Sequence, residues 1–324
     1  MEFRTQLSNL SSATKMAYQE PILGIGSCFI ENIGSLLQTY KFPTLLNPFG
    51  ILYNPFSIHY CLERLLENRP YTAKELIDNK GIWYSFDHHG RFSSTDPNTA
   101  IELINHSFQE AVTFLKNTKW LIVTLGTATV YRYKTTKKVV ANCHKLPNSQ
   151  FTKERLSVAQ IVDTLSTTFE ALQKNRPATN ILLTVSPVRH IKDGIIENQR
   201  SKATLLLAVD QLVNQFEQVS YFPAYELVMD DLRDYRFFEK DLVHPNQLAV
   251  AYIWEAFEQA YFTESTSQLK NKILKIVNAS QHRPFHPNSP QHQQFIKKQL
   301  IQIELLEASY PYLSFEKEKN LLKG

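Results

Sequence analysis

Residues 22–29 read Ile-Leu-Gly-Ile-Gly-Ser-Cys-Phe, a short apolar run that ends in Gly-Ser. An amphipathic stretch follows to about Tyr40, with apolar side chains at helical spacing on one side and polar ones on the other. This pattern predicts a strand, a sharp turn and a helix, with Ser27 at the carboxyl end of the strand. A hydroxyl group there is exposed beside a helix N-terminus, whose free N–H groups stabilise negative charge. A nucleophilic role for Ser27 then requires a base from elsewhere in the chain.

The composition is that of a folded protein with a sizeable core. Of the 324 residues, 43% are hydrophobic and 20% are charged, which excludes extensive disorder. The formal net charge is only +4 and no block of Lys and Arg occurs, so nucleic-acid binding is not expected. The three cysteines, Cys28, Cys61 and Cys143, lack metal-site spacing and are odd in number for pairing, so we expect reduced thiols in a reducing compartment.

The sequence contains neither a recognisable secretory signal nor a membrane span. Its first 19 residues hold no apolar core region, and no apolar run is long enough to cross a bilayer. We therefore expect a cytoplasmic protein, with no cofactor and no bound metal. His282, His286 and His292 lie close in sequence, but no cysteine or carboxylate lies among them, so we expect these histidines to be solvated.

Strands and helices alternate along the chain, which predicts an α/β fold with a parallel sheet covered on both faces. After the first strand and helix, the expected strands are Phe42–Leu46, Ile82–Phe86, Trp120–Leu125, Ile181–Val185 and Tyr221–Met229, with a hairpin from Val130–Tyr133 and Val139–Cys143. The expected helices are Ile58–Leu66, Pro97–Asn117, Ser157–Lys174, Ser201–Val219 and Gln247–Phe262.

The character of the sequence changes after Thr263. Leu269–Val277 and Phe295–Leu306 are amphipathic segments rich in Lys and Gln. We expect residues 1–262 to form the α/β domain. Residues 263–324 are expected to form a helical appendage that packs on this domain or on a second subunit.

Polar clusters recur where the predicted strands end. They comprise Ser27, residues 47–54, Gly126-Thr127, Arg189-His190 and residues 241–244. Open α/β sheets bind ligands beyond the carboxyl ends of their strands, so these clusters predict one common site. The loop at residues 87–94 adds two adjacent histidines, His88 and His89, of which at most one should face this site. Surface exposure without a catalytic role is the alternative for both.

The late motif Asp241-x-x-His244 offers the base that Ser27 needs. A carboxylate holds a catalytic histidine in the correct tautomer and stabilises the imidazolium. The spacing lets Asp241 reach His244 within one turn, and the order Ser, Asp, His along the chain suits an α/β scaffold. The simpler alternative is that Ser27 and Asp241 only cap helices. The glycines before Ser27 form only half of a dinucleotide fingerprint, because Phe29 stands at the third glycine position.

Residues 26–30, Gly-Ser-Cys-Phe-Ile, and residues 47–55, Asn-Pro-Phe-Gly-Ile-Leu-Tyr-Asn-Pro, resemble the GSCFA domain family. The resemblance extends through residues 186–190 and 241–246, covers roughly residues 20–262, and departs from the family signature at Ile30. This family is grouped with the SGNH/GDSL hydrolases. The resemblance therefore implies a catalytic domain with a flavodoxin-like, three-layer α/β/α fold of SGNH type, followed here by the C-terminal helical extension.

The resemblance also implies roles for individual residues. Ser27 corresponds to the nucleophile of the first SGNH block, and Asp241 and His244 correspond to the last block. Gly50 corresponds to the glycine of the second block, whose N–H group helps to hold the oxyanion together with the N–H group of Ser27.

One part of the SGNH pattern is missing. The third block normally reads Gly-x-Asn-Asp, whereas residues 126–129 read Gly-Thr-Ala-Thr. The absent asparagine is an oxyanion donor, and loss of one such donor costs about 3 kcal/mol of transition-state stabilisation. We expect Asn54 or Thr127 to replace it.

The sequence thus predicts a serine-dependent esterase or acyltransferase that acts on an acyl ester, such as an acetylated carbohydrate. His89, Arg189 and His190 are expected to bind a polar or anionic part of the substrate, with a buried, hydrogen-bonded His190 as the alternative. Cys28 is expected to pack in the core. The rival prediction, favoured by Ala128, is a protein that keeps the fold and binds a glycan or another ligand without turnover.

Overall fold

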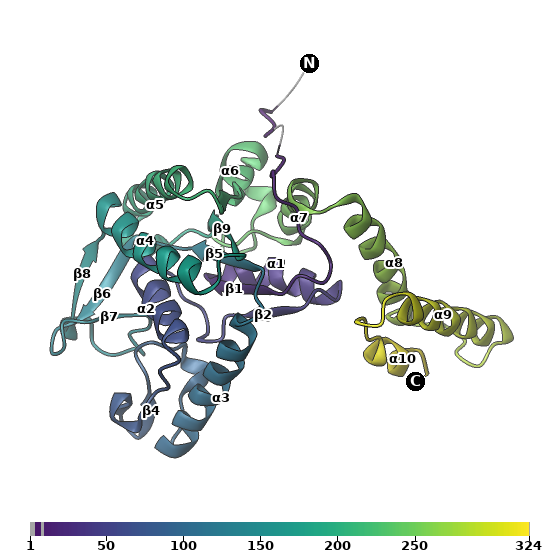
Figure 1. Cartoon of the computed structure of the whole chain (residues 1–324), viewed down its shortest axis with the longest axis horizontal. Helices are drawn as coiled ribbons and strands as arrows, with labels where there is room; N and C mark the ends of the chain where they lie inside the picture. The colour runs from purple at the N-terminus through teal and green to yellow at the C-terminus, as the bar shows by residue number, and fades with distance from the viewer. Residues whose placement is uncertain (1–3, 8–9, 324) are drawn as a thin grey trace.

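The computed structural model describes residues 4–7 and 10–323 and has a five-stranded parallel sheet at its centre (Figure 1). The strand order is β10-β9-β5-β1-β2, which corresponds to the flavodoxin-like order 2-1-3-4-5 when only these strands are counted. The strands are β1 (Ile22–Gly26), β2 (Thr44–Leu46), β5 (Trp120–Leu125), β9 (Asn180–Val185) and β10 (Val219–Tyr221).

Helices cover both faces of this sheet because the strand side chains alternate between two buried clusters. Leu23 and Val123 belong to one cluster, whereas Ile22 and Ile122 belong to the other. The first cluster includes α2 (Pro55–Leu66), α3 (Pro97–Leu115), α4 (Val158–Asn175) and α5 (Ile195–Gln215), and the second includes α1 (Cys28–Thr39) and α7 (Gln247–Tyr261). The predicted α/β fold with a parallel sheet is confirmed.

Two small antiparallel sheets flank the central sheet. One pairs β3 (Ile77–Asn79) with β4 (Ile82–Tyr84), and the other has the order β7-β6-β8, from β6 (Thr129–Tyr133), β7 (Val139–Val140) and β8 (Phe151–Arg155). The β6–β7 hairpin was predicted. Strand β8 was not predicted, because most of its side chains are polar and exposed and give no apolar alternation.

Several predicted elements differ from the observed ones by two or three residues at an end, and two differ more. The strand expected at Tyr221–Met229 ends at Tyr221, and the chain continues as α6 (Ala224–Glu226) and a π-helical segment (Leu227–Leu232) that contacts α7. A short apolar run does not distinguish a strand from a buried helix. The helix expected at Ser201–Val219 is α5, which begins six residues earlier, after Gly194. Its first turn exposes apolar side chains, so the helical pattern is recognisable only farther along.

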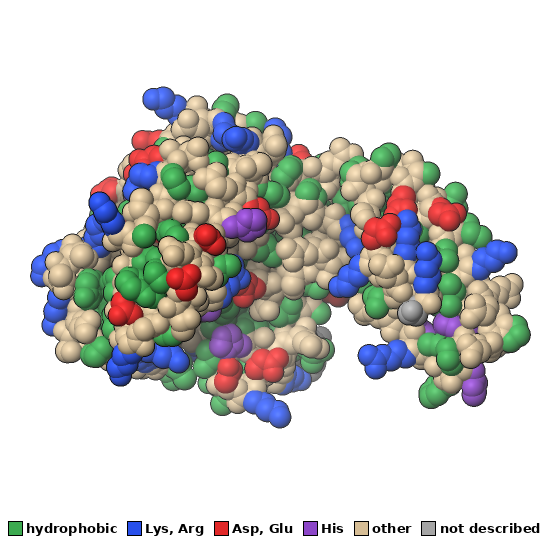
Figure 2. Space-filling model, turned by 90° about the horizontal axis from the view of Figure 1, so that it is seen from below, with side chains coloured by type: hydrophobic (Ala, Val, Ile, Leu, Met, Phe, Trp, Pro, Cys, Tyr) green, Lys and Arg blue, Asp and Glu red, His purple; other side chains and the backbone are tan. Residues whose placement is uncertain are grey.

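Three helices follow the α/β region: α8 (Glu264–Ser280), α9 (Pro290–Ser309) and α10 (Glu316–Lys323), of which α10 was not predicted. Figure 1 shows α9 and α10 to one side of the sheet, and Figure 2 shows histidine side chains on the surface of this region. Lys41, just after α1, pairs with Glu318 of α10 at 2.8 Å. No helix among the described residues is long and apolar enough to cross a membrane. The division of the chain after residue 262 stays a prediction.

Candidate active site

Strand β1 places Ser27 at the carboxyl edge of the sheet, between β2 and β5, where the strand order reverses. The side chain of Ser27 is 1% exposed, and its Oγ accepts a long hydrogen bond from the Phe29 N–H at 3.4 Å. Its own N–H donates to the Thr124 carbonyl oxygen at 3.0 Å. Gly26 permits this close approach, because its φ is +144° and an added Cβ would lie 2.2 Å from the same oxygen.

Asn47 fixes the turn that precedes Ser27. Its Oδ1 accepts from the Gly26 N–H at 2.9 Å, and its carbonyl oxygen accepts from the Gly50 N–H at 2.7 Å. Gly50 has a φ of +79°, and an added Cβ would lie 2.2 Å from the His89 Cβ. Gly50 therefore closes a tight turn directly against His89. Asn47 was predicted to lie in a polar cluster, but its hydrogen bonds to Gly26 and Gly50 were not predicted.

The Asp241–His244 pair has the geometry of a carboxylate that orients a histidine. Asp241 Oδ2 lies 2.7 Å from His244 Nδ1, and Oδ1 accepts from the N–H groups of Val243 and His244 at 2.9 and 3.0 Å. These backbone and side-chain bonds lower the pKa of Asp241 to about 2, so the carboxylate is ionised at neutral pH. With Nδ1–H donating to Asp241, Nε2 is the nitrogen left to accept a proton.

The turn that carries His244 is attached to the loop after β9. The Arg189 N–H donates to the Val243 carbonyl oxygen at 3.4 Å, and Arg189 Nη1 donates to the Leu242 carbonyl oxygen at 3.3 Å. Among the described residues, no hydrogen bond joins Ser27 Oγ to His244. The structure therefore brings Asp241 and His244 together but shows no contact between that pair and the serine, and the triad stays a prediction.

A cleft of about 590 Å³ opens beyond the ends of β5 and β9. Five predicted site residues line it: His89, Asn54, Thr127, Arg189 and His190. The remaining lining includes tyrosines and lysines, namely Tyr53, Tyr131, Lys145 and Lys192. Polar groups from four separate segments thus meet in one cavity, as expected for a site at the carboxyl edge of an α/β sheet.

The four groups expected to hold an oxyanion differ in whether they are free to donate a hydrogen bond. The N–H groups of Ser27 and Gly50 already donate to backbone carbonyl oxygens, so they can reach an oxyanion only by breaking those bonds. Thr127 Oγ1 lies 2.9 Å from Ser201 Oγ and also accepts from the Thr129 N–H. Asn54 Oδ1 caps α2 by accepting from the Ser57 N–H at 2.9 Å, which leaves the Nδ2 group of Asn54 as a donor for the cleft.

His190 is a neutral histidine against the wall of this cleft. Burial, assisted by the nearby charge of Lys202, lowers the pKa of His190 to about 4. Its Nε2 is buried without a hydrogen-bond partner among the described residues, 3.3 Å from where a Cβ on Gly126 would lie. The Tyr53 ring meets the imidazole edge-on with centroids 5.2 Å apart. His190 thus presents an uncharged ring beside the end of β5.

Two further side chains complete the site. Lys202 of α5 is 1% exposed and donates to the carbonyl oxygens of Gly126 and Ser186, both at 2.6 Å. It was not predicted as a site residue, because a lysine in a helical pattern is expected on the surface. Cys28 is partly buried, and burial raises the pKa of its thiol, which makes it a weak nucleophile. In the part of the chain that the structure describes, no group of three or more His, Cys, Asp or Glu side chains is arranged to hold a metal ion.

These features define an α/β protein of flavodoxin-like strand order, with a serine and an Asp-His pair near the carboxyl edge of the sheet. The chain belongs to the GSCFA family, whose model matches residues 21–257. The model of the GSCFA domain protein C-terminal domain matches residues 273–323.

Comparison with individual proteins adds little to the family match. No curated protein matches the chain. A solved structure from Streptococcus pneumonia, proposed to be a platelet activating factor, is 13% identical with a TM-score of 0.38, covering 74% of this chain and 83% of that chain. A similarity this distant carries no argument about function.

Proposed function

We propose that this protein is a serine-dependent esterase or acyltransferase of SGNH type that acts on acyl esters. The observation that carries the proposal is the 2.7 Å contact between ionised Asp241 and His244 Nδ1, on a turn that is bonded to the loop after β9. Ser27 Oγ attacks the ester carbonyl, and His244 Nε2 takes its proton and passes it to the leaving alcohol. Water or a second alcohol then resolves the acyl-enzyme.

In this proposal Asn54 Nδ2 takes the place of the missing block-three asparagine. Its amide is held in one orientation because Oδ1 caps α2, so the donor is preorganised. The N–H groups of Ser27 and Gly50 join it once the substrate oxyanion replaces their present carbonyl partners. Thr127 contributes by shaping the loop through its bond to Ser201.

The cleft suggests the kind of ester. Tyr53 and Tyr131 offer ring faces, while Arg189, Lys145 and Lys192 offer positive charge. Aromatic and polar groups in one open cleft suit a hydroxyl-rich acyl ester such as an acetylated carbohydrate, and His89 and His190 would contact its polar groups.

A binding protein without turnover is the second candidate. Two observations favour it: the residue at position 128 is Ala, and the N–H groups of both Ser27 and Gly50 are occupied by carbonyl oxygens. On this account the cleft recognises a glycan, and the Asp241–His244 pair only stabilises its turn.

Hydrolysis of acetylated sugars and of nitrophenyl esters, compared between wild type and His244→Ala, separates the two candidates. An esterase loses turnover in the variant, because the serine no longer has a base. A binding protein shows no His244-dependent turnover and binds the sugar equally well with either side chain. Asp210→Asn, a change on the exposed face of α5, serves as the matched control.

A further inference from the structure

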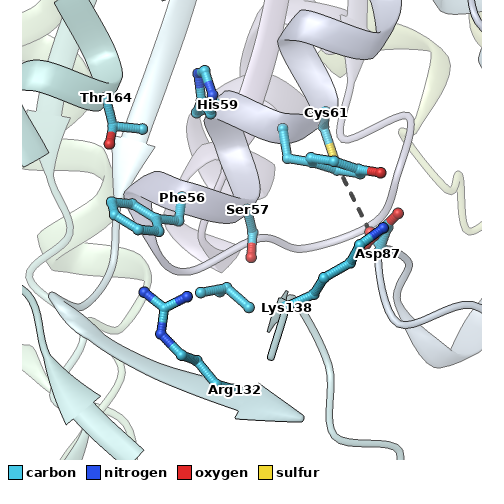
Figure 3. A pocket seen from close by; sticks show the side chains of 10 residues that line it. Phe56, Ser57, His59, Cys61, Asp87, Arg132, Lys138 and Thr164 are labelled. Carbon is cyan, nitrogen blue, oxygen red and sulfur yellow. Dashed lines mark hydrogen bonds between the residues drawn. The ribbon is translucent and has the colours of Figure 1, made fainter. Parts of the chain in front are cut away.

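A second cavity, of about 330 Å³, lies between the first turns of α2 and the β6–β7 hairpin (Figure 3). Its lining comprises Phe56, Ser57, His59, Tyr60, Cys61, Asp87, Arg132, Lys138, Val139 and Thr164. None of these residues is among those that line the larger cleft beyond β5 and β9. The small sheet separates the two, since Tyr131 faces the cleft while its neighbour Arg132 faces this cavity.

The floor of the cavity holds a hydroxyl group without a partner. Ser57 is 6% exposed, and its Oγ has no hydrogen-bond partner among the described residues. Figure 3 shows this oxygen pointing into the space between α2 and the side chains of Arg132 and Lys138. A buried polar group without a partner costs free energy, which a ligand oxygen bonded to Ser57 would recover.

The charge around Ser57 favours an anion. Arg132 donates through Nε to Glu154 at 2.7 Å, but its Nη2 group has no partner among the described residues. The Lys138 side chain extends toward Asp87, as Figure 3 shows, so its charge lies at the other end of the cavity. Ser57 also lies in the first turn of α2, where the helix dipole is positive. Glu154 offsets part of this charge from outside the cavity.

The opposite end of the cavity has a different chemistry. Asp87 lies there with its backbone carbonyl oxygen 4.0 Å from Cys61 Sγ, as Figure 3 shows. Its carboxylate repels a second anion, so an acidic ligand must place its charged group at the Arg132 end. Apolar and aromatic side chains line the rest of the cavity: Phe56, whose ring centroid lies 5.8 Å from the Arg132 guanidinium, together with Tyr60 and Val139. They suit a short apolar group.

We propose that this cavity binds a small carboxylic acid with a short apolar body. The carboxylate accepts from Ser57 Oγ and Arg132 Nη2, and the apolar body lies against Phe56 and Val139. The cavity and the larger cleft share two structural elements, because Asn54 caps α2 and Val140 follows Val139 on β7, and both line that cleft. This site does not depend on the esterase function.

Calorimetric titration of the full chain with hexanoate, and with hexanamide as a neutral match, tests the proposal. Hexanoate should bind in the millimolar range or tighter, and hexanamide about tenfold more weakly. Amide chemical shifts should change at Ser57 and Val139. Absence of saturable hexanoate binding, equal binding of the amide, or shift changes confined to the cleft would each overturn the proposal.

Substitutions provide the second half of the test. Arg132→Gln should weaken hexanoate binding about tenfold, and Ser57→Ala should weaken it less. Val139→Trp fills the cavity and should abolish hexanoate binding. This variant is informative only if its thermal unfolding is cooperative; otherwise Arg132→Gln alone decides the test. Lys134→Gln, an exposed change on the same hairpin outside the cavity, is the control and should bind as wild type does. Unchanged affinity in Arg132→Gln contradicts the proposal.

Discussion

The Nζ atom of Lys202 lies 2.6 Å from the Gly126 carbonyl oxygen, and an equal contact reaches Ser186. One buried side chain of α5 thus ties together the ends of β5 and β9, from which the cleft loops emerge. Burial lowers the pKa of Lys202 to about 7 from its usual 10.5. A neutral amine still has two N–H groups for the two carbonyl oxygens, so deprotonation need not break the link.

Lys202 should make folding stability depend on pH. Between about pH 7 and pH 10.5 the unfolded chain binds the proton that folded Lys202 has lost. Stability of the wild type should therefore rise with pH across this window relative to Lys202→Met, by up to a few kcal/mol, since one pKa unit is worth about 1.4 kcal/mol. Urea unfolding of both proteins at several pH values measures the difference. Parallel pH profiles would rule this account out.

Gly50→Ala should destabilise the turn against His89. An added Cβ would lie 2.2 Å from the His89 Cβ, and the alanine would also have to adopt a φ of +79°. Gly81→Ala is a matched control, because Gly81 has a φ of +81° and an added Cβ there meets nothing within 4 Å. We expect about 1 kcal/mol of loss at Gly81 from backbone strain and about 2–4 kcal/mol at Gly50, measured by denaturant unfolding. Equal losses would show that His89 simply moves aside.

Substitution of Asn54 can separate its helix-capping role from the oxyanion role that we propose for it. Aspartate keeps an oxygen to accept from the Ser57 N–H but lacks the Nδ2 donor. Asn54→Asp should therefore unfold like wild type but lose about 100-fold or more in esterase turnover. Asn54→Ala should lose turnover and also about 1 kcal/mol of stability, because the cap is gone. If Asn54→Asp retains full turnover, the oxyanion donor lies elsewhere.

Asp241→Asn tests the orientation of His244. Asparagine can still accept from the Val243 and His244 N–H groups, but it supplies no carboxylate for the His244 imidazolium. Both side chains are about half exposed, so stability should stay close to that of the wild type. Turnover of an ester should fall by about four orders of magnitude. A variant that keeps most of its kcat would indicate that Asp241 is only a structural residue of the turn.

The sheet and its covering helices were predictable because their signals are local. Buried strands such as Trp120–Leu125 are continuous apolar runs, and α4 has apolar side chains at helical spacing throughout. Local signals fail where polar residues form a strand, as in β8, or where an apolar run is short, as after Tyr221. The pairing of β8 with β6 depends on contacts with a segment about 20 residues away, which the local pattern of β8 does not indicate.

The site was predictable only in part. Strand ends brought Asn54, Thr127 and His190 into one cleft, as the α/β rule requires. Lys202 could not be found, because burial of a lysine is decided by the packing of α5 against the ends of two strands. The hydrogen bond from the Gly50 N–H to the Asn47 carbonyl oxygen could not be predicted either, because it is set by the geometry of the turn.

The central claim is that His244 activates Ser27, and labelling by a fluorophosphonate probe, measured by intact mass, tests it most directly. Wild type should gain one adduct, Cys28→Ala should label equally, and Ser27→Ala and His244→Ala should not label. A folded wild type that fails to label, or a His244→Ala variant that labels at the wild-type rate, would contradict the account.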